Sequence, residues 1–170
     1  MDKIKVGIAG CLGRMGQELV KATTKDKRIK FVGGYDLKNS KTHSNDIFQG
    51  ANIIIDFSSP AAIKGNVSLA LSYKTGLVVG TTGLNHKETI LLKKASKKIP
   101  ILYSSNMSLG VNLLFELVRQ TSLALKDIDY DIEISETHHK HKKDAPSGTA
   151  ISLGKLLPKE GRFLFQKTKF

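Results

Sequence analysis

The stretch of sequence that decides the fold is KIKVGIAGCLGRMGQELVKATTK, residues 3–25. Its first part, residues 3–9, has the apolar character of a buried strand. Its last part places apolar residues at helical spacing, and glycines at positions 10, 13 and 16 join the two parts. The pattern therefore predicts a strand, a glycine-rich turn and a helix, an arrangement that holds a pyrophosphate against bare backbone at a helix N-terminus.

An acidic residue supports a dinucleotide as the ligand of this turn. Asp36 follows about twenty residues later, at the predicted end of the second strand, where its carboxylate would bind ribose hydroxyls of an adenosine. The glycine spacing is G-x-x-G-x-x-G rather than the usual G-x-G-x-x-G. Asp36 slightly favours NADH, because it repels the 2′-phosphate of NADPH, while Lys38 offsets this in part. The alternative is a structural turn without a ligand. Cys11 is expected to be a small residue that fills the turn and to have no redox role.

The rest of the chain alternates strands with helices as far as residue 126. Residues 39–50 are polar and are expected to form a loop. Short apolar strands with helical crossovers predict an α/β fold, a Rossmann-type doubly wound parallel sheet, in residues 1–106, followed by a second, α+β domain in 107–170. Strands are expected at 29–35, 52–57, 76–80, 99–103 and 129–136, and helices at 60–73, 86–98 and 109–126.

The composition limits the classes of function. The net charge is +12, but 23 of the 27 basic residues are lysines, whereas nucleic-acid readers usually include arginine for its bidentate hydrogen bonds. We therefore expect no nucleic-acid partner, but an attraction for anionic substrates and cofactors. No apolar run approaches the roughly 18–20 residues that span a bilayer, so no membrane partner is expected. Because Cys11 is the only cysteine and no signal peptide is recognisable, the predicted location is cytoplasmic.

Three predicted strand ends carry small polar residues that suit a cofactor. In an open parallel sheet, ligands bind beyond the carboxyl ends of the strands. Hydroxyl and amide groups there are expected to bind the ribose and the carboxamide of a nicotinamide, although such residues are also common in turns that bind nothing. The segments are Asp56-Phe57-Ser58, Gly80-Thr81-Thr82-Gly83 and Ser104-Ser105-Asn106-Met107.

Histidine and lysine crowd together in residues 136–150, ETHHKHKKDAPSGTA. His138, His139 and Lys142 are candidates for proton transfer and for binding acidic groups. Gly148-Thr149 opens a predicted helix, whose N–H groups would seat a carboxylate. No metal is expected, because the lysines would repel a cation and zinc sites usually add Cys or acidic ligands at set spacing. The alternative is a solvated basic loop.

These motifs together resemble the 4-hydroxy-tetrahydrodipicolinate reductase (dihydrodipicolinate reductase) family. The resemblance covers residues 3 to about 155 and is most specific in residues 136–150. It implies the reduction of 4-hydroxy-tetrahydrodipicolinate, a small dicarboxylate, to tetrahydrodipicolinate with NADH or NADPH, in lysine and diaminopimelate biosynthesis. Besides the glycine turn and residues 136–150, the motifs that carry it are Asp56-Phe57-Ser58, Gly80-Thr81-Thr82-Gly83 and Asn106-Met107-Ser108-Leu109-Gly110-Val111-Asn112.

The resemblance also implies a role for individual residues. His138 would be the catalytic acid/base and Lys142 the catalytic proton donor. His139, Gly148 and Thr149 would hold the substrate carboxylates. The cofactor-binding residues would be Gly10, Cys11, Leu12, Gly13, Arg14, Met15, Asp36, Gly80, Thr81, Thr82, Ser104, Ser105, Asn106 and Met107.

The chain departs from this family in its length. Family members continue through the rest of a substrate-domain sheet and work as homotetramers joined through it. Here the residues after about 155 are expected to lack the family's pattern, so the second domain would be incomplete and the tetramer interface mostly absent. The strand at 129–136 would then lack sheet partners. A truncated coding sequence, a missing part supplied by a second polypeptide, and a non-catalytic dinucleotide-binding remnant of the enzyme all fit this expectation.

Overall fold

The computed structural model describes residues 2–37, 44–127, 132–138, 146–157 and 163–169. The chain divides into two compact units, Met1–Ser105 and Asn106–Phe170. This division falls one residue before the boundary expected at residue 106. Each unit has its own sheet and its own helices.

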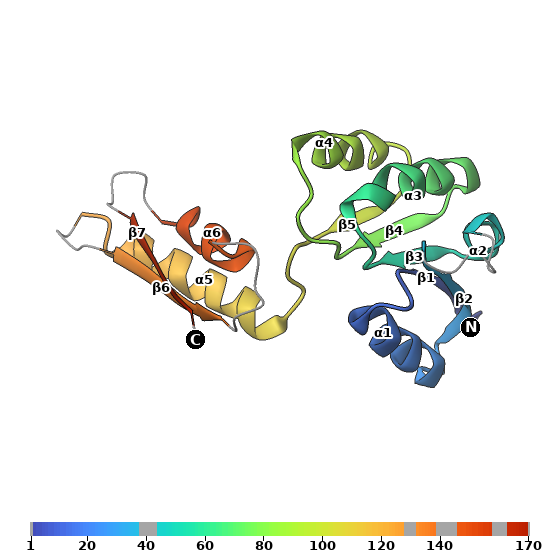
Figure 1. Ribbon diagram of the computed structural model, residues 1–170, viewed down its shortest axis with the longest axis horizontal. Helices are drawn as coiled ribbons and strands as arrows, with labels where there is room; N and C mark the ends of the chain where they lie inside the picture. Colours follow the sequence, from blue (N-terminus) through green and yellow to red (C-terminus); the bar gives the residue numbers. More distant parts are fainter. Residues whose placement is uncertain (1, 38–43, 128–131, 139–145, 158–162, 170) are drawn as a thin grey trace. The chain divides into compact units, whose positions relative to one another are not determined.

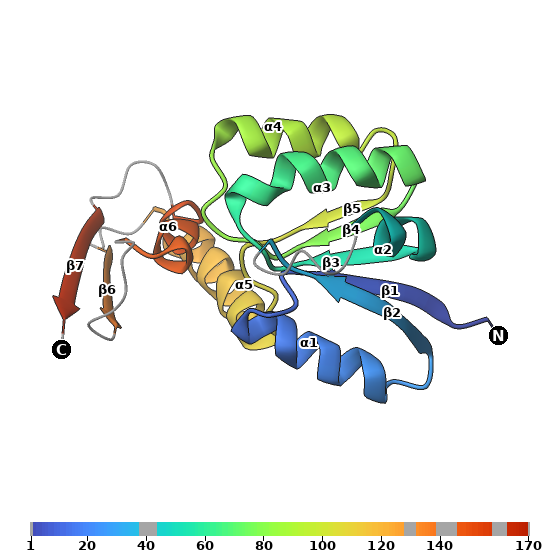
Figure 2. The ribbon, with the colours of Figure 1, turned by 45° about the vertical axis from the view of Figure 1, so that its right-hand side comes forward.

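The first unit is built on a parallel sheet of five strands in the order β2-β1-β3-β4-β5. The chain reverses direction across the sheet at β1, because β2 lies on one side of β1 and β3 on the other (Figure 2). Such a switch point opens a crevice at the carboxyl ends of the two strands that flank it. The strands are β1 (Ile4–Ala9), β2 (Ile29–Tyr35), β3 (Ile53–Asp56), β4 (Gly76–Val79) and β5 (Ile101–Tyr103).

Helices pack on both faces of this sheet, which confirms the predicted doubly wound α/β fold (Figure 1). One face carries α1 (Arg14–Lys25), which contacts β1 and β2. The opposite face carries α2 (Ser44–Gly50), α3 (Pro60–Tyr73) and α4 (His86–Ala95), which contact one another in sequence order. Pro60 occupies the first turn of α3, where its missing N–H and fixed φ do no harm.

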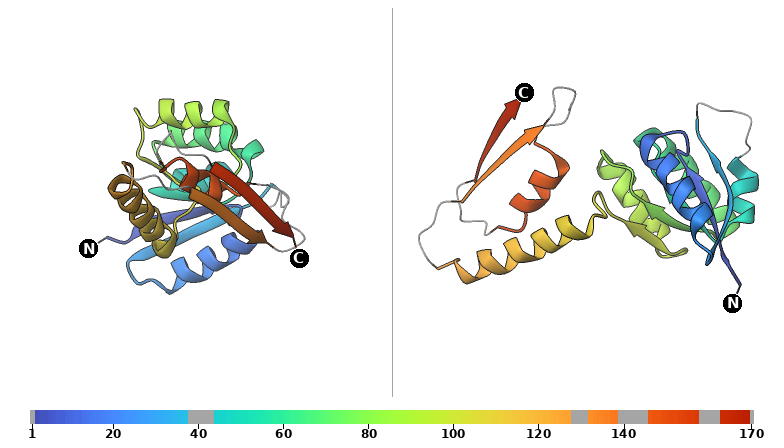
Figure 3. Two further views of the ribbon diagram at one scale, coloured as in Figure 1. Left: turned by 90° about the vertical axis from the view of Figure 1, so that its left-hand side faces the viewer. Right: turned by 90° about the horizontal axis from the view of Figure 1, so that it is seen from below.

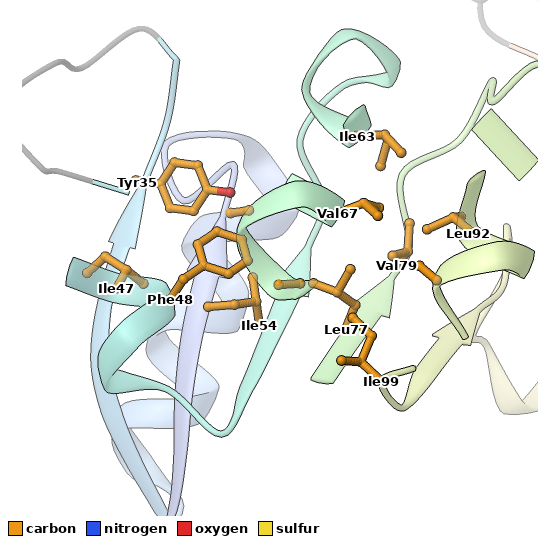
Figure 4. Close-up of a cluster of buried hydrophobic side chains, with 13 residues drawn as sticks. Tyr35, Ile47, Phe48, Ile54, Ile63, Val67, Leu77, Val79, Leu92 and Ile99 are labelled. Atoms are coloured by element: carbon orange, nitrogen blue, oxygen red, sulfur yellow. The ribbon is translucent and has the colours of Figure 1, made fainter. Parts of the chain in front are cut away.

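The core of the first unit lies between the sheet and the helices α2, α3 and α4 (Figure 4). The sequence predicts a loop at residues 39–50, and this prediction is wrong for 44–50, which form α2. The cause is tertiary packing: Phe48 is fully buried and its ring lies 5.9 Å from that of Tyr35, so burial outweighs the polar character of the segment. Residues 38–43 lie outside the described residues.

The second unit contains α5 (Leu109–Ala124), β6 (Ile132–His138), α6 (Gly148–Gly154) and β7 (Phe163–Lys169) (Figure 3). Strands β6 and β7 pair in parallel, from Ile132 opposite Phe163 to His138 opposite Lys169. The expectation that the strand at 129–136 would lack sheet partners is therefore wrong. The backbone N–H and C=O groups of β6 need partners, and the segment of β7 supplies them.

None of the helices within the described parts of the chain is long and apolar enough to cross a membrane.

Candidate functional site

The glycine-rich turn between β1 and α1 is tied to the end of β2. The backbone N–H of Gly10 donates to the carbonyl oxygen of Tyr35 at 2.8 Å, and that of Cys11 donates to the same oxygen at 3.3 Å. Gly13 closes the turn by donating its N–H to the carbonyl oxygen of Gly10 at 3.1 Å. The turn therefore has a defined shape in the protein alone.

Two glycines of the turn are required by close packing. Gly10 has a φ of +79°, and a Cβ there would overlap the backbone of Phe57 at the end of β3. A Cβ on Gly16 would overlap the carbonyl oxygen of Gly10, so α1 approaches the turn only because position 16 has no side chain. These contacts are the physical reason for two of the three glycines in the motif.

The start of α1 offers a seat for an anion. Gly13 is the N-cap residue and has no side chain to satisfy the N–H groups of the first turn, and no acidic residue lies in that turn. The N–H groups of a first helical turn have no partner within the helix, and they carry the positive end of the helix dipole. A phosphate group fits this arrangement.

A cleft of about 300 Å³ lies at the switch point, beyond the carboxyl ends of β1, β2 and β3. It brings together four residues of the predicted cofactor set: Gly10, Leu12, Gly13 and Asp36. Four further lining residues were not in that set: Phe57, Ser58, Ser59 and Leu37. The first two belong to a segment that was predicted to face the cofactor because it follows a strand.

The predicted residues Cys11, Arg14 and Met15 do not line this cleft. Arg14 and Met15 are exposed in the first turn of α1. Cys11 is half-buried and lines a second cavity of about 430 Å³, between α1 and β2. Burial raises the pKa of the Cys11 thiol above its ordinary value, and the nearby charge of Asp36 raises it further.

A buried hydrogen-bond network lies beneath the cleft and is centred on Asp56. This residue ends β3, is fully buried, and accepts hydrogen bonds from Ser58, Asn66 and Thr81. The hydroxyl of Thr81, a predicted cofactor-binding residue, is therefore directed at the carboxylate of Asp56, and the side chain is 4% exposed.

The other predicted cofactor-binding residues follow β4 and β5. Gly80 lies against the ring of Phe57, and Thr82 is exposed. The N–H of Ser104 donates to the carbonyl oxygen of Val79, and Ser105 is exposed. The remaining two, Asn106 and Met107, belong to the second unit.

In the second unit, Glu136 connects His138 to the start of α6. Its Oε1 accepts the backbone N–H of Ser147 at 2.8 Å, and its Oε2 lies 3.7 Å from Nδ1 of His138. Ser147 caps α6 by accepting the N–H of Ala150 at 3.1 Å. Gly148 and Thr149, the predicted carboxylate seat, are the first two residues of that helix. His139 and Lys142 lie outside the described residues.

Within the described parts of the chain, no three His, Cys, Asp or Glu side chains form a group that would hold a metal ion. His139 and His141 are outside those parts.

Comparison with known proteins gives the family. Residues 4–107 match the family described as "Dihydrodipicolinate reductase, N-terminus", and residues 110–167 match "Dihydrodipicolinate reductase, C-terminus". The chain belongs to the dihydrodipicolinate reductase family. The match as far as residue 167 corrects the expectation that the family's pattern ends near residue 155.

Three relatives, each named 4-hydroxy-tetrahydrodipicolinate reductase, illustrate the match. The relative from Rickettsia akari is 43% identical over 157 residues, which are 92% of this chain and 63% of the relative. The one from Pelagibacter ubique is 45% identical over 91% of this chain and 63% of its own length. The one from Zymomonas mobilis is 42% identical over 95% of this chain and 64% of its own length. The chain thus spans 63–64% of the length of these dihydrodipicolinate reductase relatives.

A solved structure shares the fold. The dipicolinate-bound dihydrodipicolinate reductase from Paenisporosarcina sp. TG-14 is similar with a TM-score of 0.70 at 22% identity. The similarity covers 99% of this chain and 79% of that chain.

Proposed function

We propose that this chain binds NADH or NADPH in the cleft at the glycine turn and reduces 4-hydroxy-tetrahydrodipicolinate to tetrahydrodipicolinate. This reaction would place it in lysine and diaminopimelate biosynthesis. The observation that carries the proposal is the cleft itself, in which a bare glycine turn, a helix N-terminus and Asp36 meet in a member of the dihydrodipicolinate reductase family.

The residues of the cleft fit a dinucleotide. The first turn of α1, which begins with Arg14 and Met15, presents N–H groups to the pyrophosphate, while the N–H of Gly13 is already bonded to the carbonyl of Gly10. Leu12 lines the cleft beside this turn. Asp36 accepts hydrogen bonds from the adenosine ribose and favours NADH over NADPH. When bound, the cofactor supplies a hydride to the substrate.

Backbone and small side chains after β4 and β5 would hold the nicotinamide half of the cofactor. Because the hydroxyl of Thr81 is engaged by Asp56, the segment Gly80–Thr82 contributes chiefly backbone groups. The segment after β5 also offers polar backbone and side-chain groups. Its predicted cofactor-binding residues are Ser104, Ser105, Asn106 and Met107.

The residues of the second unit would bind the substrate and move protons. His138 acts as acid/base and Lys142 as proton donor to the reduced substrate. His139 and the backbone of Gly148 and Thr149 hold the two carboxylates. The dipicolinate in the solved relative is a cyclic dicarboxylate, which supports this class of substrate.

A second candidate function is the binding of NADH without turnover. It is favoured by one observation: the chain spans 63–64% of the length of its relatives, so the rest of each relative has no counterpart in residues 1–170.

The test measures binding and turnover separately on the full chain. NADH is titrated to obtain its Kd, and loss of NADH absorbance is then followed with 4-hydroxy-tetrahydrodipicolinate. We expect His138→Gln to lower turnover by about a hundredfold or more and to leave the Kd unchanged. The matched control is His86→Gln, an exposed histidine of α4, which should change neither.

Each result decides between the candidates. Turnover that His138→Gln does not reduce would reject the role of His138. Binding without turnover would favour the second candidate, and absence of NADH binding would reject both.

A further inference from the structure

We propose that Asp56 is a positioning residue of the cofactor site, which fixes the loops after β3 and β4 in one arrangement. The inference rests on the proposed function, because it concerns the binding of NADH. Asp56 does not itself line the cleft. It acts through Ser58, which does line the cleft, and through Thr81, which follows β4.

The carboxylate of Asp56 holds both loops directly. Its Oδ1 accepts the N–H of Ser58 at 3.0 Å, the hydroxyl of Ser58 at 2.6 Å and the hydroxyl of Thr81 at 2.9 Å. The N–H of Ser58 also donates to the hydroxyl oxygen of Thr81 at 3.0 Å. Three residues from two strand ends are thereby joined in a closed set of hydrogen bonds.

The other carboxylate oxygen extends the network to β2. Oδ2 accepts the side-chain amide N–H of Asn66 at 2.7 Å, and the amide oxygen of Asn66 accepts the hydroxyl of Tyr35 at 2.6 Å. Burial and the charge of Asp56 raise the pKa of Tyr35, which keeps its hydroxyl protonated as the donor. The carbonyl of Tyr35 in turn accepts the N–H of Gly10, so the chain of contacts ends at the glycine turn.

The burial of this carboxylate points to a positioning role. Asp56 is fully buried, and the structure records no ion pair between it and any residue in the described ranges. Burying a charge without a cation is costly unless donors converge on it. Four donor groups, from Ser58, Thr81 and Asn66, do so here. If only stability mattered, apolar residues in place of Asp56 and its side-chain partners together would avoid the cost of burying these groups.

The packing of Phe57 against Gly80 extends this restraint to a wall of the cleft. The residue between Asp56 and Ser58 is Phe57, whose ring lies against Gly80, where a Cβ would overlap it. Fixing Ser58 and the loop after β4 therefore restrains the ring of Phe57, a residue that lines the cleft.

The experiment compares Asp56→Asn with the exchange Asp56→Asn/Asn66→Asp in the full chain. In the single variant, the amide N–H of residue 56 meets the amide N–H of Asn66, so one of the two donors lacks an acceptor. In the exchange variant, the amide of residue 56 donates and the carboxylate of residue 66 accepts. The carboxylate at position 66 then accepts from both residue 56 and Tyr35, and Ser58 and Thr81 still donate to an oxygen at position 56.

The measured quantities are the Kd for NADH and the thermal unfolding midpoint. We expect Asp56→Asn to weaken NADH binding about tenfold and the exchange to restore most of this loss. The matched control is Thr75→Val, which removes another buried hydrogen bond, from the hydroxyl of Thr75 to the carbonyl of Phe48 at 2.9 Å, away from the cleft. It should lower the unfolding midpoint and leave the Kd of the folded protein unchanged.

The outcomes separate this inference from the proposed function. Wild-type protein that does not bind NADH would reject the proposed function. Wild-type binding with an equal Kd in Asp56→Asn would overturn the positioning role alone, as would an exchange variant that is folded but as weak as the single variant. If Asp56→Asn fails to fold, Asn66→Ala keeps the carboxylate of Asp56 and removes both the donor to its Oδ2 and the acceptor of the Tyr35 hydroxyl. An unchanged Kd in that variant overturns the inference.

Discussion

The carboxylate oxygen Oε1 of Glu136 accepts a hydrogen bond of 2.8 Å from the backbone N–H of Ser147. This bond joins the strand that carries His138 to the first turn of α6. In the proposed reaction, the strand supplies the acid/base and the helix start supplies the carboxylate seat. Glu136 therefore holds two parts of the proposed substrate site in register, although it was not among the residues expected to form that site.

Loss of the Glu136 carboxylate should loosen the start of α6. In Glu136→Ala we expect hydrogen exchange at the amides of 147–151 to accelerate about tenfold, because a hydrogen bond to a charged acceptor is lost. Glu136→Gln keeps an acceptor oxygen and should accelerate exchange less. The measurement is hydrogen–deuterium exchange by mass spectrometry, and equal exchange in all three proteins would contradict the role of this contact.

Alanine at position 16 should be destabilising, although alanine is normally favoured in a helix. A Cβ there overlaps the carbonyl oxygen of Gly10, so we expect the free energy of unfolding to fall by about 1–3 kcal/mol. The matched control is Gly65→Ala in the interior of α3, where a Cβ would meet no atom within 4 Å. That change should raise the free energy of unfolding by about 0.5–1 kcal/mol. Urea denaturation measures both, and the same sign for the two variants would refute the packing argument.

Replacement of Asp36 should change the choice of cofactor. Asp36→Asn removes the carboxylate that is proposed to bind the ribose and to repel a 2′-phosphate. We expect the Kd for NADH to rise about tenfold and the Kd for NADPH to rise less. The preference for NADH over NADPH should therefore become smaller or reverse. The control is Glu18→Gln, an exposed acid on α1 paired with Lys21. An unchanged ratio of the two Kd values in Asp36→Asn would show that Asp36 does not set the preference.

The pH dependence of Cys11 alkylation should reveal the effect of the Asp36 charge on the thiol. The pKa of the Cys11 thiol is raised mainly by burial and then by the charge of Asp36. The rate of alkylation by iodoacetamide is proportional to the fraction of Cys11 in the thiolate form. The pH at which this rate is half-maximal should therefore be higher than for a cysteine in a short reference peptide. Asp36→Asn removes the repulsion of the thiolate, so the midpoint should move to lower pH, but only part of the way because burial remains. Because Cys11 is the single cysteine, the rate needs no correction for other thiols.

Most of the first unit was predictable because its signals are local. The strand Ile4–Ala9, the glycine turn and the helix after it follow from apolar periodicity and glycine placement alone. Helix α2 was not predictable in the same way, because its two buried residues, Ile47 and Phe48, stand in a polar segment. Only their packing against the sheet makes that segment a helix.

The site was predictable in position but not in detail. Ligands bind beyond the carboxyl ends of the strands in an open parallel sheet, and this rule located Asp56–Ser58 and Gly80–Gly83 at one edge of the sheet. It could not tell that the hydroxyl of Thr81 faces Asp56, because side-chain direction depends on a contact between segments that are 25 residues apart. The pairing of β6 with β7 is likewise a contact between distant segments, and no periodicity within the strand Ile132–His138 reveals it.

The backbone contacts of Gly10, Cys11 and Gly13 have a consequence for the kinetics of ligand capture. Their three amide N–H groups are already bonded within the protein, so the loop is ordered when the chain folds. These residues lose their conformational entropy when the chain folds. Binding of a ligand at the turn therefore carries no further entropic cost for ordering them. Encounter with a dinucleotide should therefore be a rigid docking step at the turn.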